Sequence, residues 1–198
     1  SRSGDEHAQG AGALVLAVRN TIETPLSKDL LFAWHRTVMA GRRHVATGQW
    51  RTDAEPMQVV SGAYGHEKFH FEAPPSSRVP SEMARYIRWF NETAPGGRKA
   101  IQKAAVRSAV AHLYFESIHP FEDGNGRIGR ALSEKALSQG LGRPALLSLS
   151  NAIEAKRRDY YDALKEAQQS NEITPWLTWF VRMTIEAQAQ AEAQIDFT

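Results

Sequence analysis

The chain has 198 residues, of which 24 are Lys or Arg and 22 are Asp or Glu, and its net charge of +2 favours one ordinary globular domain over a polybasic nucleic-acid-binding surface. It contains no cysteine, which excludes disulfides, thiolate metal sites and a cysteine nucleophile and fits a cytoplasmic protein. No apolar run reaches the roughly 18 residues that cross a bilayer, so no membrane partner is expected.

The N-terminal end is predicted to contribute little structure. Residues 1–10 are small and polar, which is typical of a disordered or trimmed end, so the domain is expected to cover residues 11–198. The chain begins with Ser1 rather than Met, which predicts a piece of a longer protein. A first helix is expected over the apolar stretch Ala13–Arg19, and a second from Ser27, as N-cap, to about Met39.

Residues 41–80 break the helical pattern with four glycines and four prolines. Two short strands are predicted here, Met57–Ser61 and Lys68–Phe71, and the glycines of the link between them favour a hairpin with a longer loop. A segment of this length with so little helical pattern is more often functional than idle.

The rest of the chain is predicted to be helical, which gives a mainly α fold with one small β-hairpin. The expected helices are Ser81–Asn91, Lys99–Ile118, Arg127–Gln139 ended by Gly140, one from the N-cap Asn151 to about Gln169, and one that opens at Thr174-Pro175.

A glycine-containing turn joins two of these helices within residues 119–130. Gly124 and Gly126 flank the start of the second helix, where unpaired N–H groups and the positive end of the helix dipole favour an anion. Arg127 and Arg130 follow in the first turns, where dipole effects alone disfavour cations. Because an arginine fork matches phosphate oxygens, the stretch predicts a phosphate site.

The same stretch contains a candidate base and a candidate metal ligand. His119 closes the preceding helix and could take a proton from a hydroxyl. Asp123 could hold Mg²⁺ beside a phosphate, or it could stabilise the loop as an Asx turn. Phe121 is expected to anchor the loop in the core, Glu122 to face solvent, and His112 to be a core histidine.

The stretch resembles the signature of the Fic family, His-Pro-Phe-x-Asp-Gly-Asn-Gly-Arg-x-x-Arg, at all nine specified positions. The resemblance is to a bacterial subgroup and extends roughly over residues 12–185. It includes Gly48-Gln49-Trp50-Arg51, the segments 57–62 and 71–75, Tyr160-Tyr161-x-Ala163-Leu164, and Ile173-Thr174-Pro175-Trp176-Leu177.

The resemblance implies a Fic-type helical bundle and a protein adenylyltransferase. Such an enzyme transfers AMP from ATP to a Tyr, Thr or Ser hydroxyl of a target protein, releases pyrophosphate, and can adenylylate itself. The family pattern makes His119 the general base and Asp123 the ligand of Mg²⁺ on the α- and β-phosphates. It assigns the α-phosphate to Asn125 with the backbone of Gly124 and Gly126, the β-phosphate to Arg127, and the γ-phosphate to Arg130.

Two further regions receive roles from the resemblance. The hairpin at about 57–72 would be the family's flap, which clamps the target protein through Gln58, Val59, Val60, Ser61 and Gly62. The adenine and ribose would lie beside Tyr160, Tyr161, Leu164 and Gln168. Many family members have Asn at the last of these positions, so Gln168 leaves open the strictness for ATP over other nucleotides.

Many relatives silence themselves with a helix whose glutamate pairs with the second arginine, and no such motif occurs in residues 1–198. The resemblance implies that it lies upstream of Ser1. Two alternatives stay open: a Fic-fold enzyme that transfers another phosphate-containing group, and a non-catalytic nucleotide-binding regulatory module. Gly126 stands where phosphotransferase variants have lysine, which favours adenylylation. Nucleic acid is not expected as a partner of this fragment, and whether it dimerises is left open.

Overall fold

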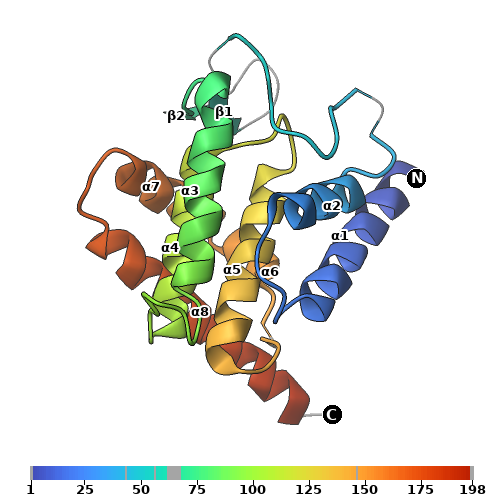
Figure 1. Ribbon diagram of the computed structural model, residues 1–198. Coiled ribbons are helices and arrows are strands. Elements are labelled where there is room, and N and C mark those ends of the chain that lie inside the picture. The colour runs from blue at the N-terminus through green and yellow to red at the C-terminus, as the bar shows by residue number, and fades with distance from the viewer. Residues whose placement is uncertain (1, 43, 56, 62–67, 146, 197–198) are drawn as a thin grey trace.

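A computed structural model describes residues 2–42, 44–55, 57–61, 68–145 and 147–196. Its architecture is a bundle of helices with a two-stranded hairpin at one end, which confirms the mainly α prediction (Figure 1). The elements in chain order are α1 (Arg2–Asn20), α2 (Lys28–Val38), β1 (Gln58–Ser61), β2 (Lys68–Glu72), the 3₁₀ turn η1 (Ser76–Arg78), α3 (Val79–Glu92), α4 (Ala104–Ile118), α5 (Asn125–Leu141), α6 (Leu149–Ala155), α7 (Arg157–Gln168) and α8 (Thr174–Asp196). None of the helices in these described ranges is long and apolar enough to cross a membrane.

The helices α4 and α5 form the centre of the bundle and pack against each other more extensively than any other pair of elements (Figure 1). Their close approach explains Gly140, where an added Cβ would lie only 2.4 Å from the Cβ of Ala104. The prediction that Gly140 ends the helix is therefore wrong. The helix continues to Leu141 and is capped by Gly142, which adopts the left-handed conformation with φ 65°.

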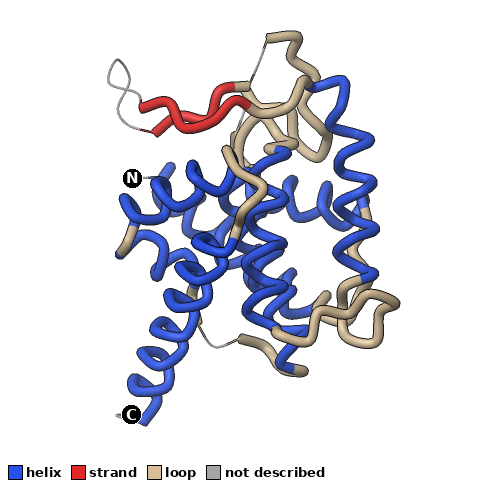
Figure 2. Tube along the Cα trace, turned by 90° about the vertical axis from the view of Figure 1, so that its left-hand side faces the viewer, coloured by secondary structure: helices blue, strands red, loops and turns tan. Residues whose placement is uncertain are grey.

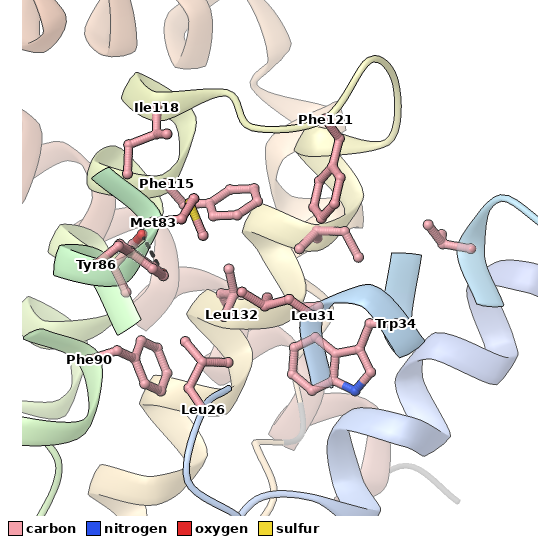
Figure 3. Close-up of a cluster of buried hydrophobic side chains, with 14 of the residues drawn as sticks. Leu26, Leu31, Trp34, Met83, Tyr86, Phe90, Phe115, Ile118, Phe121 and Leu132 are labelled. Carbon is pink, nitrogen blue, oxygen red and sulfur yellow. Dashed lines mark hydrogen bonds between the residues drawn. The ribbon is translucent and has the colours of Figure 1, made fainter. Parts of the chain in front are cut away.

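The central helix α4 lies between two hydrophobic clusters. The first, shown in Figure 3, joins α1–α5 and the loop after α4 through large side chains that include Leu31, Trp34, Tyr86, Phe90, Phe115 and Phe121. The second joins α4 and α5 to α6, α7 and α8 through side chains that include Leu113, Leu149, Tyr160, Trp176 and Phe180. Because other helices cover α4 on both sides, its sequence carries apolar residues around most of the helix circumference.

Several helix starts differ from the sequence-based boundaries. The helix α1 begins at Arg2, within the stretch expected to be disordered, and Gly10 faces the end of α2. Ser27 caps α2 as predicted, its Oγ accepting a hydrogen bond from the Leu30 N–H. The N-cap of α6 is Ser148 rather than Asn151, and this helix ends at Ala155 before α7 begins.

The hairpin lies at the end of the bundle where α4 gives way to α5 (Figures 1 and 2). Its strands are antiparallel, with Gln58 opposite Glu72, and the register shifts between Val59 and Val60. The two strands match the predicted ones within one residue at each end. The predicted connection at residues 62–65 lies outside the described residues.

Candidate active site

The loop between α4 and α5 begins with a strained histidine. His119 ends α4 in the left-handed conformation, with φ 50° and ψ 61°, and it is the only residue other than glycine with a positive φ in the described part of the chain. This conformation costs an ordinary residue about 1–2 kcal/mol. Its side chain is 15% exposed, so the surroundings that hold the backbone also decide where the imidazole points.

A buried arginine from the segment before the hairpin holds this backbone. Arg51 is 2% exposed, and its Nε donates to the carbonyl of His119 over 2.8 Å. Its backbone N–H donates to the carbonyl of Pro120 over 2.9 Å, and its guanidinium also donates to the carbonyl of Pro74, just after β2. Arg51 thus connects the loop between α4 and α5 to the base of the hairpin, a role that sequence reasoning missed.

Phe121, two residues after His119, is held in place by a second histidine. Phe121 is fully buried, as predicted, and its ring stacks on His35 of α2 with centroids 3.9 Å apart and planes at 5°. The Gly48 N–H donates to His35 Nδ1 over 2.9 Å, which leaves the ring proton on Nε2 to donate to the carbonyl of Asp123 over 3.0 Å. Burial lowers the pKa of His35, which favours this neutral form.

Glu122 does not face solvent as expected. Its Oε2 accepts a hydrogen bond of 3.0 Å from the N–H of Ala46, so it fastens the segment after α2 to the loop. The sequence pattern places Glu122 beside Asp123 but gives no sign of a partner 76 residues earlier.

The side chain of Asn125 is used within the loop. Its Oδ1 accepts from the N–H of Phe121 over 2.9 Å, its Nδ2 donates to the carbonyl of the same residue over 2.8 Å, and the residue is 3% exposed. A contribution of Asn125 to a phosphate therefore falls to its backbone N–H, at the first position of α5. Gly124, the N-cap, adopts φ 82°, which a glycine accommodates without strain.

The carboxylate of Asp123 is the open acidic group of the loop. Its Oδ1 accepts from the N–H of the next residue, Gly124, over 2.6 Å, and its Oδ2 lies 3.8 Å from the Arg127 guanidinium. The side chain is 43% exposed, so Oδ2 remains accessible to a ligand. Within the described ranges, no group of three or more His, Asp or Glu side chains gathers closely enough to hold a metal ion by itself.

Arg127 and Arg130 border a small hollow beside the start of α5, together with Val38 and Ser150. Arg127 donates to the carbonyl of Val38 over 3.1 Å, and the Nε of Arg130 donates to Ser150 Oγ over 3.0 Å. An added Cβ at Gly126 would lie 3.2 Å from the Arg130 guanidinium, so that group lies over the first turn of α5. The structure thus brings both arginines, the glycine turn and Asp123 to one end of α5.

The four residues expected on the adenine side differ in exposure. Tyr160 and Leu164 are 4% and 5% exposed within the second hydrophobic cluster, and the Tyr160 hydroxyl lies 2.9 Å from His112 Nε2. His112 is thus a core histidine, as predicted, and burial lowers its pKa. Tyr161 and Gln168 are partly exposed on α7, which packs beside β2.

The expected flap residues lie in the hairpin, but only part of the segment is described. Gln58 is exposed and opens β1, which continues to Ser61. Gly62 lies outside the described residues.

Fold and site together define a helical domain in which the loop between α4 and α5 brings a histidine, a carboxylate and two arginines to one helix N-terminus. The sequence profile of the Fic/DOC family matches residues 25–137. Because this is more than half of the chain, the protein belongs to the Fic/DOC family.

Individual relatives agree with this assignment. The chain is 33% identical over 99 residues to the probable protein adenylyltransferase aq_aa38 of Aquifex aeolicus, which covers 50% of this chain and 27% of that protein. It is 30% identical over 142 residues to protein adenylyltransferase fic-1 of Caenorhabditis briggsae, which covers 72% of this chain and 24% of that protein. A crystal structure of a Fic family protein from Desulfovibrio desulfuricans G20 superposes with a TM-score of 0.72 at 28% identity, over 90% of this chain and 51% of that one. The chain therefore spans about a quarter of the length of these curated relatives.

Proposed function

We propose that this chain transfers AMP from ATP to a hydroxyl side chain of a target protein and releases pyrophosphate. One observation carries the proposal: the imidazole of His119 stands at the end of α4, and the next helix begins with a glycine turn, an open carboxylate and two arginines. The names of the curated relatives, which are protein adenylyltransferases, support the same reaction.

The first turn of α5 would hold the triphosphate. The backbone N–H groups of Asn125 and Gly126 begin the helix and favour an anion, as does the positive end of its dipole. Arg127 would serve the β-phosphate and Arg130 the γ-phosphate. Both guanidiniums now donate to a protein oxygen, Val38 carbonyl and Ser150 hydroxyl respectively, and a phosphate would offer them a charged acceptor instead.

The loop also fits a magnesium ion bound together with the nucleotide. Mg²⁺ usually keeps several waters and takes one or two carboxylates with substrate phosphates rather than a protein cage. Asp123, with an accessible Oδ2, supplies one such carboxylate. A bound Mg²⁺ would neutralise phosphate charge, and Asp123 would fix its place relative to α5.

His119 would act on the acceptor. Its neutral imidazole takes the proton of the target hydroxyl while that oxygen bonds to the α-phosphorus, and the bond from the α-phosphorus to the bridging oxygen of pyrophosphate breaks. The role of the chain is mainly to position these groups and to stabilise charge, which is what phosphate-centred transfer requires.

The hairpin would receive the target. A two-stranded sheet leaves an unpaired edge on β1, from Gln58 to Ser61, to which an extended segment of a target protein can add as a further strand. The nucleotide base would then lie between this hairpin and α7, beside the partly exposed Tyr161 and Gln168 and above the buried Tyr160 and Leu164. The absence of cysteine from the sequence fits a cytoplasmic place for this reaction.

The test uses ATP labelled at either the α- or the γ-phosphate, with Mg²⁺ and a soluble protein extract as acceptor. Label from the α-position is expected on protein and should be lost in His119→Ala. His44→Ala removes an exposed histidine outside the loop and serves as the matched control. Label from the γ-position would support a phosphotransferase instead, and binding of ATP without label from either position would support a regulatory module.

A further inference from the structure

An acidic side chain is buried inside the most apolar helix of the bundle. Glu116 lies on α4, one turn before His119, and is 4% exposed. Burying a carboxylate is costly unless it meets a cation or hydrogen-bond donors. Its placement therefore calls for a partner.

The atoms that face each other are the carboxylate of Glu116 and the ring of His119. Glu116 Oε2 lies 3.6 Å from His119 Nδ1. Glu116 Oε1 and His119 Nδ1 are both buried without a hydrogen-bond partner. The distance of 3.6 Å exceeds that of a hydrogen bond, and such contacts are often long before substrate binds.

The space for this carboxylate comes from the neighbouring helix. An added Cβ at Gly129 of α5 would lie 2.3 Å from Glu116 Oε1 and 3.4 Å from the ring of Phe115. Gly129 therefore leaves the room that the carboxylate occupies, so that Glu116, His119 and Gly129 form one unit.

The surroundings keep the carboxylate ionised. Burial raises the pKa of Glu116, but the contact with His119 and the nearby groups His112 and Arg130 outweigh it, so that the net shift is downward. The other titratable groups near it are Tyr160 of α7 and Tyr86 of α3, and burial raises the pKa of both hydroxyls, which keeps them neutral.

We propose that Glu116 is a positioning residue for His119: its carboxylate accepts the Nδ1 proton, fixes that tautomer and ring orientation, and so leaves the Nε2 lone pair for the incoming hydroxyl. When Nε2 takes the hydroxyl proton, the imidazolium that forms is stabilised by the adjacent carboxylate, which itself stays ionised. The kinetic consequence rests on the proposed adenylyl transfer, whereas the tautomer does not.

The first measurement is the protonation pattern of the His119 ring by ¹⁵N NMR near neutral pH, without nucleotide. The unmodified chain is expected to show a proton on Nδ1. Glu116→Gln keeps the shape of the side chain but removes its charge, and Gly129→Ala keeps the glutamate but fills its space. Both variants are expected to lose the preference for Nδ1–H. Glu82→Gln, which removes a carboxylate of α3 that pairs with Arg78 and Arg85, should leave the Nδ1–H preference unchanged.

The second measurement is steady-state kinetics of AMP transfer. Glu116→Gln is expected to lower kcat by about 10- to 100-fold, a part of what a general base contributes, with KM for ATP changed less than about twofold. An Nδ1–H tautomer that persists in a folded Glu116→Gln chain, or an unchanged kcat, would overturn the inference. A failure of the proposed function would show differently, as no transfer by the unmodified chain.

Discussion

Replacing Arg51 by methionine tests whether this residue holds the loop between α4 and α5. Methionine keeps most of the side-chain volume but loses the hydrogen bonds to the carbonyls of His119 and Pro74. A hydrogen bond from a charged donor contributes about 1.5–3 kcal/mol, so two give about 3–6 kcal/mol. Burying the apolar methionine offsets about 1.5–3 kcal/mol of this. We expect Arg51→Met to lower the free energy of unfolding by about 1.5–3 kcal/mol.

Urea unfolding at neutral pH measures this loss through the denaturation midpoint at constant slope. Arg88→Met changes an exposed arginine on α3 and should stay within about 0.5 kcal/mol of the unmodified chain. Arg51→Met should also slow AMP transfer, because the carbonyl of the strained His119 loses its hydrogen bond from Arg51. An Arg51→Met chain as stable as the Arg88→Met control would refute the reasoning.

Three further outcomes follow from packing and burial. Gly140→Ala forces a Cβ against Ala104 and should lower the free energy of unfolding in urea by about 1–3 kcal/mol. Gly12→Ala, with no neighbour within 4 Å, should stabilise α1 by about 0.5–1 kcal/mol. The reverse order of stability would contradict this packing of α4 against α5. Lys135→Met removes the donor to three carbonyls that follow α1, so amides near the end of α1 should exchange hydrogen faster, and unchanged exchange would argue against the anchor. Burial holds the pKa of His112 below 6.5, so the unfolded chain binds more protons as pH falls below 6.5. As pH falls, this group should lower the free energy of unfolding by up to about 1.4 kcal/mol per pH unit. His112→Gln should show a weaker dependence of stability on pH, and equal slopes for the two chains would contradict the role given to His112.

The parts of the site that depend on neighbouring residues could be predicted from the sequence. Ser27 caps its helix, Phe121 anchors the loop, and the glycine turn starts α5 beside Asp123, because each of these follows from local backbone chemistry. The hairpin strands were likewise visible as short β-branched and aromatic runs between glycines and prolines.

The supports of the loop could not be predicted, because their partners lie far away in the sequence. Arg51 reaches a carbonyl 68 residues later, and His35 one 88 residues later, and no spacing rule links such positions. Glu116 gave a weak local signal, as a lone acid in an apolar helix one turn before a histidine. For Asn125 the family pattern indicated a role at a phosphate, whereas its side chain forms hydrogen bonds with the backbone of Phe121 within the loop.

The central claim is that His119 and the start of α5 transfer AMP. An intact mass spectrum of the purified chain after incubation with ATP and Mg²⁺, with the chain itself as acceptor, tests it most directly. We predict a mass increase of one adenylyl group that is absent in His119→Ala. A mass increase of one phosphoryl group, or an adenylyl gain that persists in His119→Ala, would contradict it.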